Sequence, residues 1–302
     1  MTSEQRIKNL SVPEGKVDVV LDTDAYNEVD DQFAISYLIK SKEKLNTKAI
    51  YAAPFFNTRS TGPKDGMEKS YNEILKLLSL IGEKCDVFKG SENYLENEST
   101  PVNSPAAQDL AQRAEKYSAE NPLYVVAIGA ITNVASAILL NPGIVENIVV
   151  VWLGGNAQHY NHTKEFNMYQ DVAAARVVMK SGAPFVQLPC MGVVDSFTVS
   201  EPELEYWLKG KNALADYLAT SVIEEAESYA KGTAWTRVIW DVTAVAWLLN
   251  DSQRFMGSRI ISTPIPTYDN LYATDYSGYP MSYVYHINRD SLMTDLFQKL
   301  LK

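Results

Sequence analysis

Short apolar runs alternate with segments of helical periodicity over the first two thirds of this chain. The apolar runs predict strands at 17–21, 49–53, 87–89, 123–128, 148–153 and 185–188. Between them, apolar residues recur at helical spacing over 31–40, 65–81, 106–118, 133–140 and 172–181. Strands connected in this way run parallel and need helices over both faces of the sheet. The alternation therefore predicts an α/β fold with a central, mostly parallel sheet flanked by helices.

The last third of the chain has a different pattern. Its apolar spacing predicts helices over 201–208, 213–230 and 241–249. No linker rich in glycine, serine and proline, no internal repeat and no low-complexity tract divides the sequence. We therefore expect a single domain over residues 1–302, with a helical C-terminal third packed on the sheet.

Composition and charge narrow the class of function. The formal net charge of −10 disfavours binding to nucleic acid, which needs a basic surface. No apolar stretch is long enough to predict a membrane span, and residues 1–10 lack the apolar region of a signal peptide, so we expect a cytoplasmic protein. Cys85 and Cys190 lie far apart in apolar contexts, which favours two buried, reduced thiols over a disulfide framework.

Polar or glycine-rich segments follow four of the predicted strands. Asp22 and Asp24 end the first strand, Asn57 follows the second, and the segments 129–133 and 154–156 follow the fourth and fifth. The carboxyl ends of parallel strands meet at one edge of a sheet, where ligands bind in open α/β folds. We therefore expect these segments to line one shared crevice.

The segment 22–31 carries five carboxylates: Asp22, Asp24, Glu28, Asp30 and Asp31. Carboxylates this close raise one another's pKa values unless a cation lies between them. Taken singly, Asp30 could cap the next helix, and Asp31 could be a first-turn acid that interacts favourably with the positive end of the helix dipole. Taken together, they favour a site for Ca²⁺ or Mg²⁺, which prefer oxygen ligands.

Other familiar sites have no counterpart in the sequence. The three histidines form no zinc motif, and the chain has no phosphate-binding loop, no dinucleotide fingerprint and no nucleophile elbow. An oxygen-rich site for a hard cation is the chemistry that remains.

Five short sequence blocks stand in order between about residue 17 and residue 250. They are Asp22-Thr23-Asp24 with Asp30-Asp31, Gly129-Ala130-Ile131-Thr132-Asn133-Val134-Ala135, Leu153-Gly154-Gly155 with Glu165-Phe166-Asn167, Asp171-Val172-Ala173-Ala174, and Trp240-Asp241-Val242-Thr243-Ala244-Val245. Together they resemble the nucleoside hydrolases, the inosine–uridine-preferring group and its relatives. The resemblance implies calcium-dependent hydrolysis of the N-glycosidic bond of ribonucleosides to ribose and free base. It also implies a small-molecule nucleoside as the substrate. The protein itself would be a homo-oligomer, either a dimer or a tetramer.

Carried over by position, the resemblance implies a set of ligands for Ca²⁺: Asp24, Asp31, the backbone carbonyl of Ile128, and Asp241. Asp24 would also act as the general base on a water coordinated by the ion. The resemblance assigns further polar residues to the substrate: Asp30, Asn57, Asn156, Glu165 and Asn167. Loop chemistry or simple exposure would account for Asn57, Asn167 and Glu165 if each stood alone.

The chain departs from the family pattern at two places. The loop 25–29 is two residues longer than in the shortest family version and could carry Asn27 or Glu28 into the site. Trp240 stands where the inosine–uridine group has a histidine that helps the leaving base. The purine-specific branch resembles this chain in using an indole to stack on the base, which implies a purine preference, as in purine salvage. The alternative is that Trp240 is a core residue at a helix start.

Two other functions stay open. A metal-dependent phosphatase of the haloacid dehalogenase type also places Asp-x-Asp after its first strand, but it leaves Glu165, Asn167 and Asp241 unexplained. A non-catalytic protein that binds ribosyl ligands would keep the metal site and lose turnover. The missing histidine favours that function, whereas Asp24 argues against it, because binding alone needs no general base. Phosphate release would identify the first, and binding without hydrolysis the second.

Overall fold

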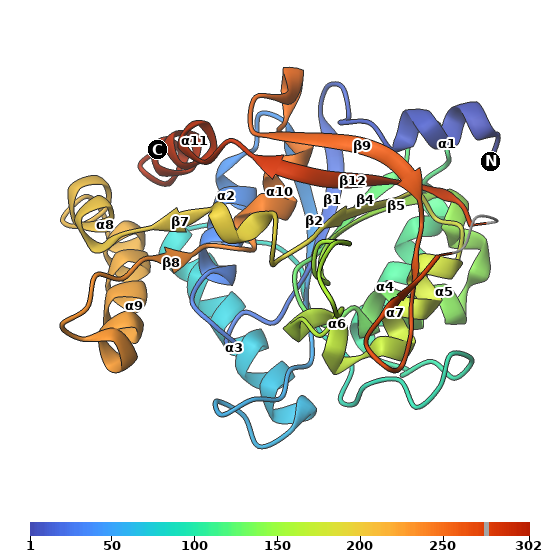
Figure 1. Cartoon of the computed structure of the whole chain (residues 1–302), viewed down its shortest axis with the longest axis horizontal. Helices are drawn as coiled ribbons and strands as arrows, with labels where there is room; N and C mark the ends of the chain where they lie inside the picture. The colour runs from blue at the N-terminus through green and yellow to red at the C-terminus, as the bar shows by residue number, and fades with distance from the viewer. Residues whose placement is uncertain (275–277) are drawn as a thin grey trace.

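An eight-stranded sheet forms the centre of the computed structural model, which describes residues 1–274 and 278–302 (Figure 1). Its strands lie in the order β3-β2-β1-β4-β5-β6-β12-β9. Their bounds are β1 (Val17–Thr23), β2 (Leu45–Ala52), β3 (Val87–Lys89), β4 (Leu123–Ala127), β5 (Ile148–Leu153), β6 (Phe185–Leu188), β9 (Met256–Ser262) and β12 (Pro280–Ile287). All neighbours pair in parallel except β12 and β9, which are antiparallel.

Helices cover both faces of the sheet (Figure 1). One face carries α2 (Asp31–Lys40), α3 (Pro63–Ile81), α10 (Val242–Leu248) and α11 (Arg289–Leu300), and the other carries α4 (Pro105–Arg113), α5 (Thr132–Leu140) and α7 (Val172–Lys180). The central strand β1 serves both cores, because Val19 and Leu21 pack on the first face and Val20 packs on the second. The continuous apolar run in the sequence thus reflects a strand buried on both sides.

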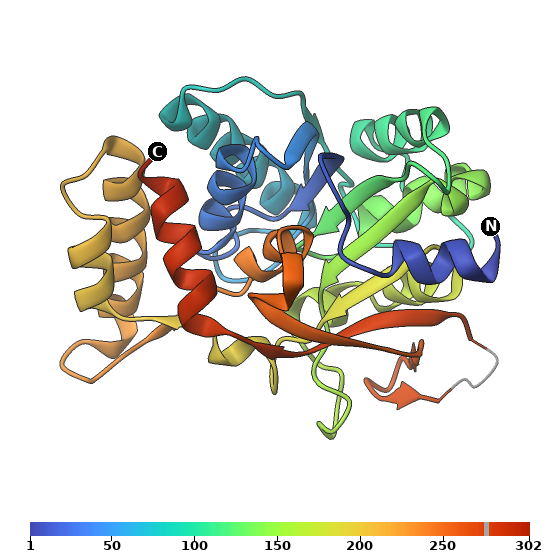
Figure 2. The same ribbon diagram turned by 90° about the horizontal axis from the view of Figure 1, so that it is seen from above.

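The remaining elements are short or lie at the periphery. They are α1 (Ser3–Asn9), α6 (Phe166–Gln170), α8 (Glu201–Trp207), α9 (Ala213–Ala230), the strand pairs β7 (Thr198–Val199) with β8 (Arg237–Val238) and β10 (Ile265–Pro266) with β11 (Tyr272–Ala273), and the 3₁₀ turns η1 (Ala114–Lys116), η2 (Pro142–Glu146), η3 (Val194–Ser196) and η4 (Asp251–Gln253). Figure 2 shows α8 and α9 beside α11 at one end of the molecule. Trp207 of α8 stacks on Phe297 of α11 there, with ring centroids 5.7 Å apart.

The α/β fold expected from the sequence is confirmed. The C-terminal third contains helices at the predicted places, but it also adds β12 and β9 to the sheet, which the sequence pattern did not predict. An edge strand with one exposed side needs few apolar residues, and β9 is partly exposed along most of its length. Among the described residues, no helix combines the length and apolarity that crossing a membrane requires.

The order of the strands changes direction next to β1. The chain runs outward from β1 through β2 to β3, then returns to the other side of β1 and continues through β4, β5 and β6. The loops that leave the carboxyl ends of β1 and β4 therefore diverge, and such a point is where open α/β sheets form a crevice.

Candidate active site

A cavity of about 390 Å³ lies at the carboxyl ends of β1, β4 and β5. Most of the residues predicted for the site line its wall: Asp24, Asp30, Ile128, Asn156, Glu165, Asn167, Trp240 and Asp241. Asp31 is buried next to this wall, and Asn57 does not line it. The volume lies within the range of cavities that hold small ligands.

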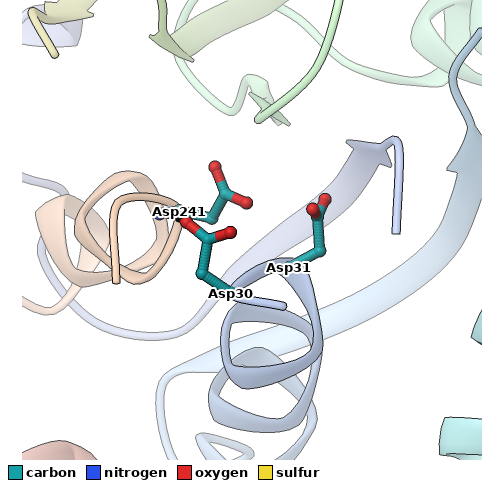
Figure 3. Close-up of side chains that lie close together, drawn as sticks. All are labelled: Asp30, Asp31 and Asp241. Carbon is teal, nitrogen blue, oxygen red and sulfur yellow. Dashed lines mark hydrogen bonds between the residues drawn. The ribbon is translucent and has the colours of Figure 1, made fainter. Parts of the chain in front are cut away.

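Three buried carboxylates meet at one end of the cavity, and we call Asp30, Asp31 and Asp241 the acid cluster. One oxygen from each lies within 4.8 Å of an oxygen from the other two. Figure 3 shows Asp30 and Asp31 at the start of α2 and Asp241 at the start of α10, with their carboxylates turned toward a common space. Neither Asp30 nor Asp241 caps its helix with a side-chain hydrogen bond. Capping therefore does not explain why these carboxylates are buried.

The carboxylate of Asp24 lies beside the acid cluster and has no hydrogen-bond partner on either oxygen among the described residues. Its side chain is 1% exposed. Gly129 leaves space for it, since a Cβ at that position would lie 3.0 Å from the Asp24 Cγ. Burying a carboxylate without a partner is costly, so a group that is not part of the chain has to balance it.

Burial is the main cause of the unusual titration of these acids. It raises the pKa values of Asp24, Asp30 and Asp241 well above the ordinary carboxyl range, and repulsion from neighbouring carboxylates raises them further. For Asp31, burial outweighs the hydrogen bond from the Thr23 hydroxyl and raises the pKa to about 7. The chain thus holds four acids that repel one another in a place that disfavours their charge.

A hard divalent cation fits this set of donors. Carboxylates and backbone carbonyls are the ligands that Ca²⁺ and Mg²⁺ prefer, and a cation reverses the pKa shift by favouring the charged form. The backbone oxygen of Ile128 lies at the same cavity, held by the Asn167 side-chain amide at 3.3 Å. The buried acid cluster could therefore hold a metal ion.

Glu165 and Asn167 also line the cavity, and hydrogen bonds fix both side chains. The Glu165 carboxylate accepts hydrogen bonds from the backbone N–H groups of Gly155 (2.7 Å), Asn167 (2.9 Å) and Met168 (3.0 Å), so it caps α6. The Asn167 amide also donates to the Leu153 carbonyl at 3.0 Å, beside its bond to Ile128. Both side chains are thus fixed in place while they face the cavity.

Asn156 and Asn57 differ in their positions. Asn156 is buried and lines the cavity, donating to the backbone carbonyl of His162 at 3.2 Å. Asn57 donates instead to the side chain of Asn27 at 2.6 Å, and Asn27 is the residue that reaches the cavity. Asn57 therefore stands one residue farther from the site than the sequence predicts.

The long loop 25–29 brings both Asn27 and Glu28 to the cavity wall, as its extra length suggests. Glu28 forms an ion pair with Arg237 of β8 at 2.5 Å. The charge of Arg237 also opposes the rise in the pKa of Asp30. The guanidinium of Arg237, which belongs to the C-terminal third, thus offsets part of the negative charge around the site.

The two interpretations of Trp240 both have support. The indole is half-buried, packs against the core and also lines the cavity. Sequence reasoning missed Tyr160, His162, Cys190 and Met191, which line the cavity as well. Their position after β5 and β6 is the signal that could have found them, because loops at that end of the sheet face the ligand.

Comparison with known proteins assigns the family. A model of the family described as inosine-uridine preferring nucleoside hydrolase matches residues 19–279, which is most of the chain. The protein therefore belongs to this family. Its members are hydrolases that act on N-glycosyl bonds, and the suspected resemblance is confirmed.

Individual relatives differ in their described specificity. The chain is 26% identical to a pyrimidine-specific ribonucleoside hydrolase RihA of Citrobacter koseri over 73% of this chain and 76% of that protein. It is 31% identical to a non-specific ribonucleoside hydrolase RihC of Salmonella paratyphi B, but the match spans 53% of this chain and only 52%, about half, of RihC. The solved structure of a purine-preferring ribonucleoside hydrolase from Gardnerella vaginalis superposes with a TM-score of 0.77 at 20% identity, covering 94% of this chain and 98% of that one.

Proposed function

We propose that the protein hydrolyses the N-glycosidic bond of ribonucleosides to ribose and free base, with Ca²⁺ bound beside Asp24 and the acid cluster. The observation that carries the proposal is the Asp24 carboxylate, which is buried and unpartnered among the described residues and borders the ligand-sized cavity. A protein that only binds ribosyl ligands needs no general base, whereas a hydrolase needs one beside the bond that it cuts.

In this proposal Asp24, Asp31, Asp241 and the Ile128 carbonyl hold the cation. When bound, Ca²⁺ would balance their charge, bind the ribose hydroxyls and lower the pKa of a water molecule. Asp24 accepts the proton of the attacking water. The carboxylates around the cavity stabilise the positive charge that develops on the ribose ring as the bond to the base breaks.

We assign the ribose hydroxyls to Asp30, Asn156, Glu165 and Asn167, which line the cavity. The fixed positions of Glu165 and Asn167 support this role, because a preorganised group loses little freedom when the substrate binds. Asn57 acts on the substrate through Asn27, to which it donates a hydrogen bond.

For the base we propose stacking against Trp240 and a preference for purines. Phe166 and Tyr160 line the same cavity and add aromatic surface. A purine offers the larger ring system to stack, and a protonated purine is attracted to an indole face. The relatives are described as pyrimidine-specific, non-specific and purine-preferring, so they favour no base, and the preference rests on Trp240 and the other aromatic side chains of the cavity.

The test is ribose release from inosine, adenosine, guanosine, uridine and cytidine, measured with Ca²⁺ and with a chelator. Asp24→Asn should lower kcat by about 10²–10⁴-fold, the usual size of a general-base contribution. Asp22→Asn is the matched control: Asp22 is equally buried, but its carboxylate accepts a hydrogen bond from Asn133 at 2.7 Å and does not line the cavity. This variant should keep its activity per folded molecule.

The outcomes separate the competing functions. Purine turnover that the chelator abolishes supports the whole proposal, whereas equal turnover of uridine removes the purine preference alone. Calcium binding without release of ribose from any nucleoside would leave a protein that only binds ribosyl ligands. Phosphate release from phosphorylated substrates, with no ribose release, would favour the phosphatase.

A further inference from the structure

The loop between β5 and α6 carries two of the three histidines of the chain, and they differ in position. His162 lines the cavity of the candidate site. His159 does not line it and instead contacts the ring of Tyr160, with ring centroids 5.2 Å apart. The third, His286, lies in β12. One imidazole therefore faces the cavity, in a chain whose Trp240 replaces the histidine expected at the start of α10.

The surroundings of His162 determine which ring nitrogen carries the proton. Its Nδ1 accepts a hydrogen bond from the backbone N–H of Lys164 at 3.2 Å. The side-chain amide nitrogen of Asn156 lies 3.5 Å from the same Nδ1. The Asn156 amide is oriented by its other end, since its oxygen accepts from the Met191 N–H at 3.4 Å. A ring nitrogen that faces two donors has to present its lone pair, so the neutral ring carries its proton on Nε2.

With Nδ1 occupied by these two contacts, Nε2 is the ring nitrogen left to meet a ligand. His162 is therefore suited to donate a hydrogen bond from Nε2. A neutral imidazole can polarise an acceptor atom in this way.

The other lining residues indicate what Nε2 can meet. The carboxylates and the Ile128 carbonyl are assigned to the cation, and Asn156, Glu165 and Asn167 are assigned to the ribose. The remaining side chains of the wall include Tyr160, Phe166, Met191 and Trp240, which offer aromatic and sulfur surface to a flat ring. His162 lines the same cavity and can supply an N–H to the ring nitrogens and carbonyl oxygens of a base.

We propose that His162 donates a hydrogen bond from Nε2 to an acceptor atom of the leaving base; this inference rests on the proposed function. When the bond between the anomeric carbon and the base nitrogen breaks, its electron pair stays on the base. The oxygen of water bonds to the anomeric carbon, a water proton goes to Asp24, and the base takes up its proton from solvent. His162 keeps its own proton and stabilises the negative charge that develops on the base.

The test compares two substrates that differ in their need for this help. Inosine has a poor leaving group, whereas 4-nitrophenyl β-ribofuranoside releases a phenolate that needs no hydrogen bond. We expect His162→Ala to lower kcat on inosine by about 10- to 100-fold, at or below the effect of removing one donor to a developing anion. The same variant should hydrolyse the nitrophenyl riboside almost as fast as wild type.

Two further variants and a spectrum sharpen the test. His162→Gln, which restores an N–H without a titrating ring, should recover part of the rate on inosine. His159→Ala, from the same loop, should leave both rates unchanged. Independently of activity, two-bond ¹H–¹⁵N correlation of histidine-labelled protein should show His162 as the Nε2-protonated tautomer, with the His162 and His159 variants assigning the signals.

Several results would overturn the inference. Equal losses on both substrates would make His162 a support of the loop, and no loss on inosine would remove it from the reaction. A rate that depends on a titration which both His162 variants lack, with no recovery in His162→Gln, would mean proton transfer instead. If wild type failed on the nitrophenyl riboside as well as on all nucleosides, the proposed function itself would be wrong, a result distinct from any effect of His162.

Discussion

Buried carboxylates occupy two neighbouring regions of this molecule, and the chain treats them differently. On the α5 side, Asp171 is surrounded by donors: the N–H of Leu95 (2.9 Å), the hydroxyl of Thr132 (2.7 Å) and the N–H of Ala174 (2.9 Å). On the α2 side, Asp24 has no donor among the described residues, and the acid cluster lies next to it.

The contrast separates structure from function among residues of the same type. An acid that the chain itself satisfies joins segments together, as Asp171 joins the loop before α4 to α5 and α7. An acid that the chain leaves unsatisfied lowers stability until something binds. The carboxylate is chemically the same in both regions, and the supply of N–H and O–H groups around it decides its role.

Changing pH should show the largest difference between the regions. Without a cation, burial raises the pKa of Asp31 to about 7, well above the value in an unfolded chain. The folded state then holds a proton that the unfolded state releases, so the contribution of Asp31 to stability is greatest at and below about pH 4 and falls as the pH rises toward 7. We expect urea unfolding in chelator to show a loss of up to about 3 kcal/mol between pH 5 and pH 7 for each such group.

Calcium offers the control for this loss. Burial also raises the pKa of Asp22 to about 7, although Asn133 opposes the shift. Ca²⁺ should abolish the part of the slope that comes from Asp31 and its neighbouring carboxylates, and Asp22→Asn should abolish the part that comes from Asp22. A slope that is identical with and without Ca²⁺ would contradict the assignment of a cation to the α2 side.

Replacing Asp171 should produce the next largest effect. Asp171→Ala removes the acceptor of three hydrogen bonds and leaves the buried Leu95 and Ala174 N–H groups unpaired. We expect the free energy of unfolding to fall by about 2 kcal/mol, while kcat per folded molecule stays the same. Chemical denaturation gives the first quantity and active-site-normalised kinetics the second. A large fall in kcat without loss of stability would place Asp171 in the site and erase the contrast.

Calcium-dependent stabilisation should be the smallest of these effects. At a concentration ten times Kd, Ca²⁺ should stabilise the folded protein by about 1.4 kcal/mol. Asp241→Asn should lose most of this gain, and Asp171→Asn should keep it, because only Asp241 belongs to the acid cluster. Thermal unfolding over a series of Ca²⁺ concentrations measures both variants. Equal stabilisation of both would mean that calcium binds elsewhere.

The sequence predicted those parts of the fold that local patterns determine. The helix at 31–40 has the bounds of α2, and the strands at 87–89, 148–153 and 185–188 have the bounds of β3, β5 and β6. The strands β9 and β12 were missed because a partner far away in the chain stabilises them, and their own residues alternate only weakly. Local propensity cannot report a pairing that depends on tertiary contacts.

The sequence predicted the candidate site residues whose positions follow from their spacing along the chain. It missed the lining residues whose positions depend on the course of a loop. Asp24, Asp30 and Asp31 follow one strand directly, so their meeting could be expected. Asp241 and Asn167 were placed by the family resemblance, since nothing in local spacing brings them to β1. The course of the loop that contains His162 depends on the contacts of Asn156 and Glu165, which no sequence pattern reveals.

The acid cluster joins residues that are remote along the chain, and this has a kinetic consequence. Asp30 and Asp241, linked by a hydrogen bond of 3.3 Å, are 211 positions apart in the sequence. Contacts of such long range close late in folding, because the entropy of the intervening loop must be lost first. A cation held by Asp31, the neighbour of Asp30, and by Asp241 should therefore bind after the transition state has passed. Calcium should slow unfolding and leave the folding rate nearly unchanged. It would then stabilise the protein after folding is complete and take no part in the folding nucleus.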